Sequence, residues 1–187
     1  LAVTHATVTL KADGTLDYQP NANFHGSDSF TYTVSSGGLT ETATVNVSVN
    51  PVTDLTATAD TASVNEDSVL NGTVATNDST ISGGTLTFAK ASDPAHGTVT
   101  VNSDGSYIYT PAANYNGPDS FTYTVTDPAS GESSTQTVSI TVGSVTDLTA
   151  TADTASVNED TVLNGTVATN DSTTSGGTLT FAKASDP

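Results

Sequence analysis

Apolar and polar residues alternate along most of the chain, with every second position apolar. In DSFTYTVTD, the residues Phe121, Tyr123 and Val125 alternate with threonines, which predicts a strand with one buried and one solvated face. Val138 and Ile140 show the same alternation, and no stretch shows the period of about 3.6 residues that marks an amphipathic helix. The predicted strands of one unit span about 55–64, 69–75, 84–90, 97–102, 106–110, 119–126 and 135–142.

Turn residues separate these strands. NSDGS at 102–106 favours a tight hairpin through its Asp-Gly pair, and YTPAANYNGPD at 109–119 holds the Pro, Asn and Gly residues of a longer turn. The fold class predicted by this pattern is all-β, built from tandem seven-stranded Greek-key β-sandwiches of immunoglobulin or cadherin type. The expected core residues are Leu86, Phe88, Phe121, Tyr123, Val125, Val138 and Ile140.

The chain repeats itself. Residues 52–94 recur at 145–187 with two changes, Ser68 to Thr161 and Ile81 to Thr174. The other half of the unit also occurs twice, in a looser form: NFHGSDSFTYTV near the start returns as NYNGPDSFTYTV. Self-similarity at a fixed period indicates an array of repeats.

The repeats divide the chain into three regions. We interpret residues 54–146 as one complete cadherin-like repeat. Residues 1–53 are then the C-terminal half of the preceding repeat, and residues 147–187 are the N-terminal half of the next one.

Composition narrows the range of partners. The chain has 3 basic residues and 20 acidic ones, which gives a formal net charge of −17. Such a surface gains nothing from a nucleic acid or an anionic membrane, and no apolar run approaches the roughly 18 residues of a membrane span. Without cysteine there are no disulfides or thiolate metal sites. We expect no nucleic-acid partner and no membrane insertion, and a cation is the natural partner.

The acidic residues are expected to gather at the ends of the sandwich. Successive connections of an antiparallel sandwich alternate between its two ends, which places Glu66, Asp119 and the linker residue Asp147 at one end. Calcium takes about 6–8 oxygen ligands from carboxylates, amides and carbonyls, and such clusters supply them. We therefore expect Ca²⁺ at the junctions between repeats. Its candidate ligands are Glu66, Asp67, Asp119, Asp147, Asp54 and Asp60.

Several motifs occur in order along the chain: NPVTD (50–54), NED (65–67), GTVTVNSDGSYIYTPAANYNG (97–117) and DSFTYTV. Over its whole length the chain thereby resembles the cadherin-like tandem repeats of giant secreted bacterial adhesins, the RTX-type surface proteins. The resemblance implies calcium between consecutive domains, which stiffens the array. Where that family writes NDxDxDGD, this chain has NDSTISGG, so Thr80, Ser82 and Gly84 stand in place of three Asp.

The expected function is structural. The array would extend an extracellular protein of the bacterial cell surface or secreted matrix, with neighbouring repeats as its partners. No Ser-His-Asp or Cys-His arrangement recurs between units, so we expect no enzyme activity.

Two alternatives remain open. One is a calcium-dependent carbohydrate-binding module for a polysaccharide, for which Tyr107 is the candidate exposed aromatic residue. The other is a self-assembling fibre subunit, in which two copies complete one sandwich by strand complementation.

Overall fold

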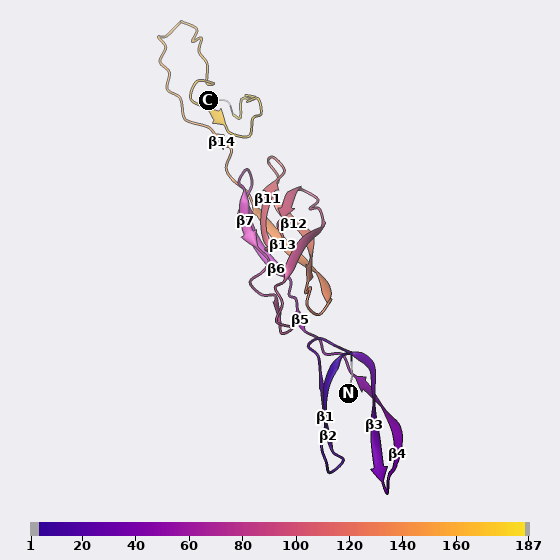
Figure 1. The fold of residues 1–187 in the computed structure, drawn as a ribbon. Helices are drawn as coiled ribbons and strands as arrows, with labels where there is room; N and C mark the ends of the chain where they lie inside the picture. Colours follow the sequence, from indigo (N-terminus) through magenta and orange to yellow (C-terminus); the bar gives the residue numbers. More distant parts are fainter. Residues whose placement is uncertain (1–3, 186–187) are drawn as a thin grey trace.

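The computed structural model describes residues 4–185, which form three parts in a row (Figure 1). We call residues 4–50 the N-terminal part, residues 54–146 the central unit and residues 147–185 the tail. The described residues contain strands and turns but no helix. The chain is therefore all-β, as the alternation of apolar residues predicts. The outer bounds of the regions interpreted from the sequence, residues 1 and 187, lie outside the described residues.

The central unit is a sandwich of two sheets. One sheet has the order β10-β11-β7, and the other has the order β6-β13-β12-β9. The first consists of β7 (Leu70–Thr73), β10 (Gly97–Val101) and β11 (Ser106–Pro111). The second consists of β6 (Asp60–Asn65), β9 (Thr87–Ser92), β12 (Gly117–Thr126) and β13 (Ser133–Gly143). This arrangement is an immunoglobulin-type sandwich.

The first predicted strand, 55–64, is two strands in the structure. A short β5 (Leu55–Thr56) pairs with β8 (Ser79–Thr80), and β6 then runs parallel to β13, where only antiparallel pairing was expected. Side chains satisfy the backbone where the chain crosses between them: Thr58 N–H donates to Asp78, and Gln136 donates to Ala57 C=O. Alternation alone does not reveal this break, because apolar residues alternate on both sides of it.

The core lies between the two sheets and contains the residues that the alternation predicts. Phe88, Phe121, Tyr123, Val125, Val138 and Ile140 are all buried. Leu86 is half-buried and packs against this core, but it precedes β9 and does not belong to it.

Tyr107 is a correction to the expectation of an exposed aromatic residue. Its side chain is buried, because Tyr107 has the same strand parity as buried Tyr109 on β11. Its ring meets Phe121 edge-on at 5.3 Å between centroids. It also covers Gly72, where an added Cβ would lie 2.4 Å from the ring. Tyr107 therefore offers no surface to a sugar. The exposed side chain next to it on β11 is that of Ile108.

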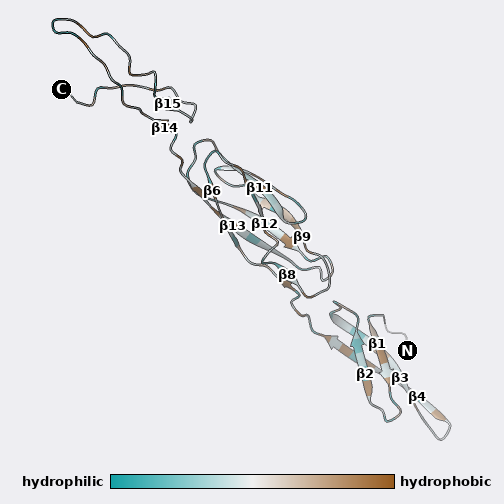
Figure 2. Ribbon diagram, turned by 90° about the vertical axis from the view of Figure 1, so that its left-hand side faces the viewer, coloured by the Kyte–Doolittle hydropathy of each residue, from teal (hydrophilic) through white to brown (hydrophobic). Residues whose placement is uncertain are grey.

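The N-terminal part has two hairpins that match β10–β13 in sequence. In one, β1 (Ala6–Leu10) pairs with β2 (Leu16–Pro20); in the other, β3 (Gly26–Ser36) pairs with β4 (Leu39–Val49). Phe30 is buried beside Tyr18, with ring centroids 6.4 Å apart. The hairpins diverge toward their tips in Figure 1. In Figure 2 their strands carry brown hydrophobic segments beside white and teal ones.

The tail keeps little regular structure. Its strands are β14 (Leu148–Thr149) and β15 (Ser172–Thr173), which pair with each other as β5 and β8 do in the central unit. The other described tail residues form no strand. Of the strands that the same sequence forms in the central unit, the tail therefore keeps only the counterparts of β5 and β8.

The core packing gives a direct prediction. Phe121→Ala removes a ring that is 1% exposed, and we expect it to lower the free energy of unfolding of the central unit by about 3–5 kcal/mol. Ile108→Ala on the neighbouring sheet is the control; its side chain is exposed, and the expected change is within about 0.5 kcal/mol. Urea unfolding followed by far-ultraviolet circular dichroism measures both. Equal losses in the two variants would contradict the described core.

Candidate functional site

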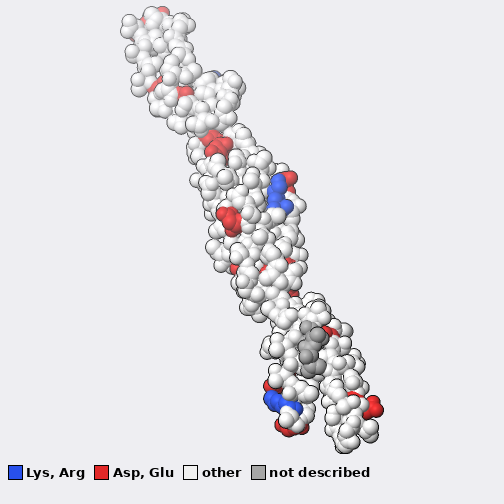
Figure 3. Space-filling view, viewed as in Figure 1, with Lys and Arg blue, Asp and Glu red and all other residues white. Residues whose placement is uncertain are grey.

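The acidic side chains are distributed along the length of the molecule. Figure 3 shows them at separate places on the face in view, from the N-terminal part to the tail. Within residues 4–185, no three Asp, Glu or His side chains come close enough together to hold a metal ion. The environment of each candidate ligand therefore decides what it does.

Glu66 fastens the linker that leaves the central unit. It follows β6, which ends beside the end of β13, and its own N–H donates to Gly143 C=O at 2.8 Å. Its carboxylate is buried; Oε1 accepts from Val145 N–H at 2.7 Å, and Oε2 accepts from Asn116 Nδ2 at 3.3 Å. Glu66 thereby joins the linker after β13 to the β6–β7 and β11–β12 connections of the sandwich.

Asp67 and Asp147 are more accessible. Asp67 has a left-handed backbone conformation with φ of 59°, and its Oδ1 accepts from Asn114 N–H at 3.3 Å. Asp147 lies half-buried in the linker and accepts from the hydroxyl of Thr174 at 2.8 Å. Each of these carboxylates accepts a hydrogen bond on one oxygen, so oxygen lone pairs remain for a further partner.

Asp119 serves as an anchor at the start of β12. Its Oδ1 accepts from the N–H groups of Ala95 and Ser120, and its Oδ2 accepts from His96 N–H at 3.1 Å and Tyr109 hydroxyl at 2.8 Å. Burial raises the pKa of Asp119, but the hydrogen bonds from Tyr109, Ser120, Ala95 and His96 outweigh it and hold the pKa below its ordinary value. Four donors occupy both oxygens, which does not fit a metal ligand.

The same anchor occurs in the N-terminal part. Asp28 accepts from the hydroxyl of Tyr18 at 2.8 Å and from Ser29 N–H at 2.8 Å. The acidic residue before SFTYTV is repeated because each copy receives the tyrosine of the neighbouring hairpin.

Asp60 is one of three oxygen partners of the hydroxyl group of the buried Tyr123. The Tyr123 hydroxyl lies 2.9 Å from Asp60 Oδ2, 3.1 Å from Asp78 Oδ2 and 3.2 Å from Thr58 C=O. Burial raises the pKa of Asp60, and the nearby Asp78 carboxylate raises it further, although the bond from Tyr123 opposes this. One phenol therefore joins β12 to Asp60 at the start of β6, to Thr58 in the crossing before β6 and to Asp78 beside β8. The sequence identified Tyr123 only as a core residue.

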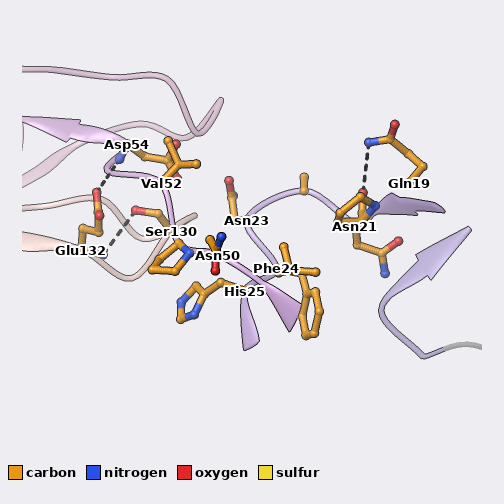
Figure 4. Close-up of a pocket in the computed structure, with 14 residues that line it drawn as sticks. Gln19, Asn21, Asn23, Phe24, His25, Asn50, Val52, Asp54, Ser130 and Glu132 are labelled. Carbon is orange, nitrogen blue, oxygen red and sulfur yellow. Dashed lines mark hydrogen bonds between the residues drawn. The ribbon is translucent and has the colours of Figure 1, made fainter. Parts of the chain in front are cut away.

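Asp54 marks the opposite end of the central unit, where a pocket of about 370 Å³ lies against the N-terminal part. Figure 4 shows Glu132 beside Asp54, whose N–H donates to Glu132 Oε2 at 2.8 Å. Leu55 N–H donates to the same oxygen at 2.7 Å. Across the junction, Asn23 donates to Ala129 C=O at 3.0 Å. Sequence reasoning missed the capping role of Glu132, because its partners lie far away in the chain.

Hydroxyl side chains stand in place of the expected aspartates in the loop at 77–84, and one of them contacts the carboxylate of Asp127. Asp127 is buried and accepts from the hydroxyls of Thr80 and Ser130. Hydrogen bonds from Ser82 and Thr80 hold the pKa of Asp127 far below its ordinary value. Hydroxyl donors thus stabilise this charged carboxylate, whereas aspartates at the positions of Thr80 and Ser82 would require a cation.

The structure thus separates the six candidates. Glu66 and Asp67 are neighbours at the exit of the central unit, with Asp147 farther along the same linker. Asp119 and Asp60 are held by tyrosine hydroxyls, and Asp54 contributes its backbone to a contact at the other end. The residues at the exit fit a calcium ion in part: they provide hard oxygen donors, and a full set requires backbone carbonyls or the next repeat.

The two packed sheets and the repeated sequence define a tandem immunoglobulin-type sandwich protein. The chain belongs to the bacterial Ig domain family, Big_9, whose model matches residues 1–48 and 50–141. No curated protein matches the chain. Within residues 4–185, no helix has the length and hydropathy that a membrane crossing requires.

Solved structures show weaker likenesses. The endo-fucoidan hydrolase MfFcnA4 of glycoside hydrolase family 107 aligns with 78% of this chain and 23% of its own, at 24% identity and a TM-score of 0.39. Extracellular cadherin domains 1–4 of protocadherin gamma B7 align with 78% of this chain and 41% of their own, at 17% identity and a TM-score of 0.37. The chain therefore spans less than half of each, and no functional conclusion follows from scores this low.

The Asp119 anchor predicts a pH dependence. A carboxylate with a depressed pKa contributes stability above its unfolded value of about 3.8 and loses it as pH falls through the folded value. We expect Asp119→Asn to be less stable than the parent at about pH 7 and to lose less stability between about pH 5 and pH 2. Urea unfolding at several pH values measures this difference.

Asp93→Asn is the matched control. It removes an acidic residue from the neighbouring connection whose side chain is 71% exposed and paired with Lys90. We expect it to follow the parent over the acid range. If Asp119→Asn also followed the parent, the carboxylate would not anchor the fold.

Proposed function

We propose that the chain is a structural segment of an extracellular bacterial protein, at the cell surface or in a secreted matrix. Its repeats add length to an adhesin or matrix fibre and carry out no chemical reaction. The proposal is supported by membership of the bacterial Ig domain family, by the near-identity of residues 52–94 and 145–187, and by the end-to-end placement of the parts (Figure 1). Near-identical repeats suit additive length better than specialised sites.

The observation that carries the proposal is the fastening of the linker by Glu66. A connection that merely joined two domains would not need a buried carboxylate bound to its backbone. The 2.7 Å bond from Val145 N–H fixes the direction in which the chain leaves the central unit. At the entry to the central unit, the exposed side chain of Asn23 donates to Ala129 C=O at 3.0 Å. Units connected in this way transmit their orientation along the array.

Calcium would complete the junction after Glu66. Asp67 and Asp147 would hold it, with Glu66 beside them and backbone carbonyls or the next repeat supplying further oxygens. When bound, the ion would neutralise these carboxylates and link the two sides of the linker. This part of the proposal rests on the oxygen chemistry of the residues. Asp119 is left out of the ligand set, because four donors already occupy its carboxylate.

A carbohydrate-binding module is less well supported. Such a site needs exposed aromatic rings beside polar groups, and the aromatic residues of β11 and β12 point into the core. A polysaccharide partner therefore has no candidate surface on these two strands.

Calcium titration of the full chain tests the proposal. We expect about 1 mM calcium to raise the melting temperature, since an ion that binds only the folded form at a hundred times its dissociation constant adds about 2.7 kcal/mol. We also expect a longer maximum dimension in small-angle scattering, because a bridged linker bends less. Both responses are expected to vanish in the double variant Asp67→Asn, Asp147→Asn.

Asp93→Asn with Asp104→Asn serves as the control pair, since it removes the same charge from exposed positions of the central unit. Its calcium response is expected to equal that of the parent. An unchanged melting temperature and dimension in the parent at about 10 mM calcium would rule out the ion, and the Glu66 contact alone would then define the junction.

A further inference from the structure

The N-terminal part and the central unit differ in the turn that joins their last two strands. In the N-terminal part this turn consists of Gly37 and Gly38, which have φ angles of 58° and 81° and connect β3 directly to β4. Positive φ at both positions is the geometry of a tight two-residue hairpin turn. In the central unit the turn is two residues longer, with DPASGE in place of SGGL. We call these residues, 127–132, the entry loop.

Hydrogen bonds within the entry loop hold it in one conformation. Asp127 is fully buried, and its Oδ1 accepts from Ala129 N–H at 3.0 Å. Its Oδ2 accepts from the hydroxyls of Thr80 and Ser130. The backbone closes the loop, since Asp127 N–H donates to Glu132 C=O at 2.8 Å. Bonds to a charged carboxylate are among the stronger hydrogen bonds, so the remaining groups of the loop point in fixed directions.

Two groups of the entry loop contact the chain that leads into the central unit. Ala129 C=O accepts from Asn23 Nδ2 of the N-terminal part at 3.0 Å. Glu132 Oε2 accepts from the N–H groups of Asp54 and Leu55, with which the central unit begins. One loop therefore fixes both the end of the linker and the unit that precedes it.

The short turn of the N-terminal part contains neither group. Ser36 and Leu39 stand where the entry loop has Asp127 and Glu132, and the position of Ala129 has no counterpart. The side chain of Leu39 is 79% exposed and contains no hydrogen-bond acceptor. A unit with the short turn therefore cannot fasten a linker in this way, whatever precedes it.

The turn that meets the entry loop has the same form in the complete central unit. Asn23 and its counterpart Asn114 both have a left-handed backbone, with φ of 60° and 55°, a conformation in which asparagine is enriched. In the central unit, Asp67 accepts from the backbone N–H of Asn114, and the side chain of Asn114 is exposed. A complete unit thus holds this turn by its backbone and presents the asparagine amide outward.

We propose that the entry loop is a docking surface for the turn of the preceding repeat, and that its length and acidic residues decide how stiff the joint is. A repeat with DPASGE fixes its orientation to the repeat before it, whereas a repeat with SGGL leaves that joint free to bend. The inference rests on the proposed structural function and adds that stiffness is encoded joint by joint. It is independent of calcium, because the contacts at the entry are hydrogen bonds between protein groups.

Pulsed dipolar electron spin resonance on the full chain tests the proposal, in a buffer that contains a calcium chelator. The chain has no cysteine, so Thr31→Cys and Thr100→Cys place one spin label on each side of the joint. Both positions are exposed and lie on strands, β3 and β10. The parent is expected to give one narrow distance distribution. Replacement of DPASGE by SGGL is expected to abolish the narrow distribution and leave a broad one.

Point variants separate the two contacts. Glu132→Leu introduces the residue of the short turn, and we expect it to broaden the distribution. We also expect it to speed amide exchange of Leu55 about tenfold or more, because a hydrogen bond to a charged acceptor is lost. Glu132→Gln keeps an acceptor oxygen and is expected to lie between Glu132→Leu and the parent. Asn23→Asp turns the amide donor into a carboxylate facing a carbonyl, and is expected to broaden the distribution without changing Leu55 exchange.

Asn114→Asp is the matched control, because it makes the same substitution at the counterpart of Asn23. It is expected to leave the distribution across the entry joint narrow. A second label pair at Thr100 and Ser139, both within the central unit, shows that each variant keeps its fold.

A broad distribution in the parent, a narrow one in the loop replacement, or equal broadening by Asn114→Asp would overturn the proposal. If the loop replacement fails to fold, Glu132→Leu and Asn23→Asp decide, and a narrow distribution in both would overturn it. None of these outcomes changes the calcium response expected from Asp67 and Asp147. Failure of this inference is therefore distinguishable from failure of the proposed function.

Discussion

The structure depends on one constraint: the apolar face of each half repeat must be covered by the other half. Residues 60–65 form β6 in the central unit, where β13 lies beside them, whereas the identical residues 153–158 form no strand. The local sequence is the same, so its intrinsic preference does not decide the outcome. A neighbouring strand and a covered face decide it, as expected for β-structure, whose stability comes from cross-strand packing.

Buried carboxylates hold the connections around this core. Glu66, Asp119 and Asp127 are all buried, and each accepts hydrogen bonds from backbone or hydroxyl donors. Charge-assisted bonds of this kind are stronger than neutral ones and leave little freedom to the loops that they tie. The acidic composition therefore has an internal use in addition to keeping the surface charged. A junction ion, in the proposed function, acts on the carboxylates that remain accessible.

The alternation of apolar residues was sufficient to predict the all-β class, the sandwich and the core around Phe121 and Tyr123. It did not reveal the break between β5 and β6 or the parallel pairing of β6 with β13, because alternation reports which face is buried and not which strand lies beside it. The burial of Tyr107 followed from its parity with Tyr109, which the sequence reasoning overlooked. The hydrogen-bond donors to Glu66 and Glu132 could not be predicted from the sequence, because these carboxylates accept from backbone groups almost eighty positions away in the chain.

Amide hydrogen exchange, read residue by residue by nuclear magnetic resonance, tests the central claim most directly, because the chain contains the same segment in a covered and an uncovered state. In dilute solution, the account predicts slow exchange in β6 and β9 and fast exchange at the identical tail residues 153–158 and 180–185. Equal protection of both segments would contradict the account, because strand formation would then not require the complementary half.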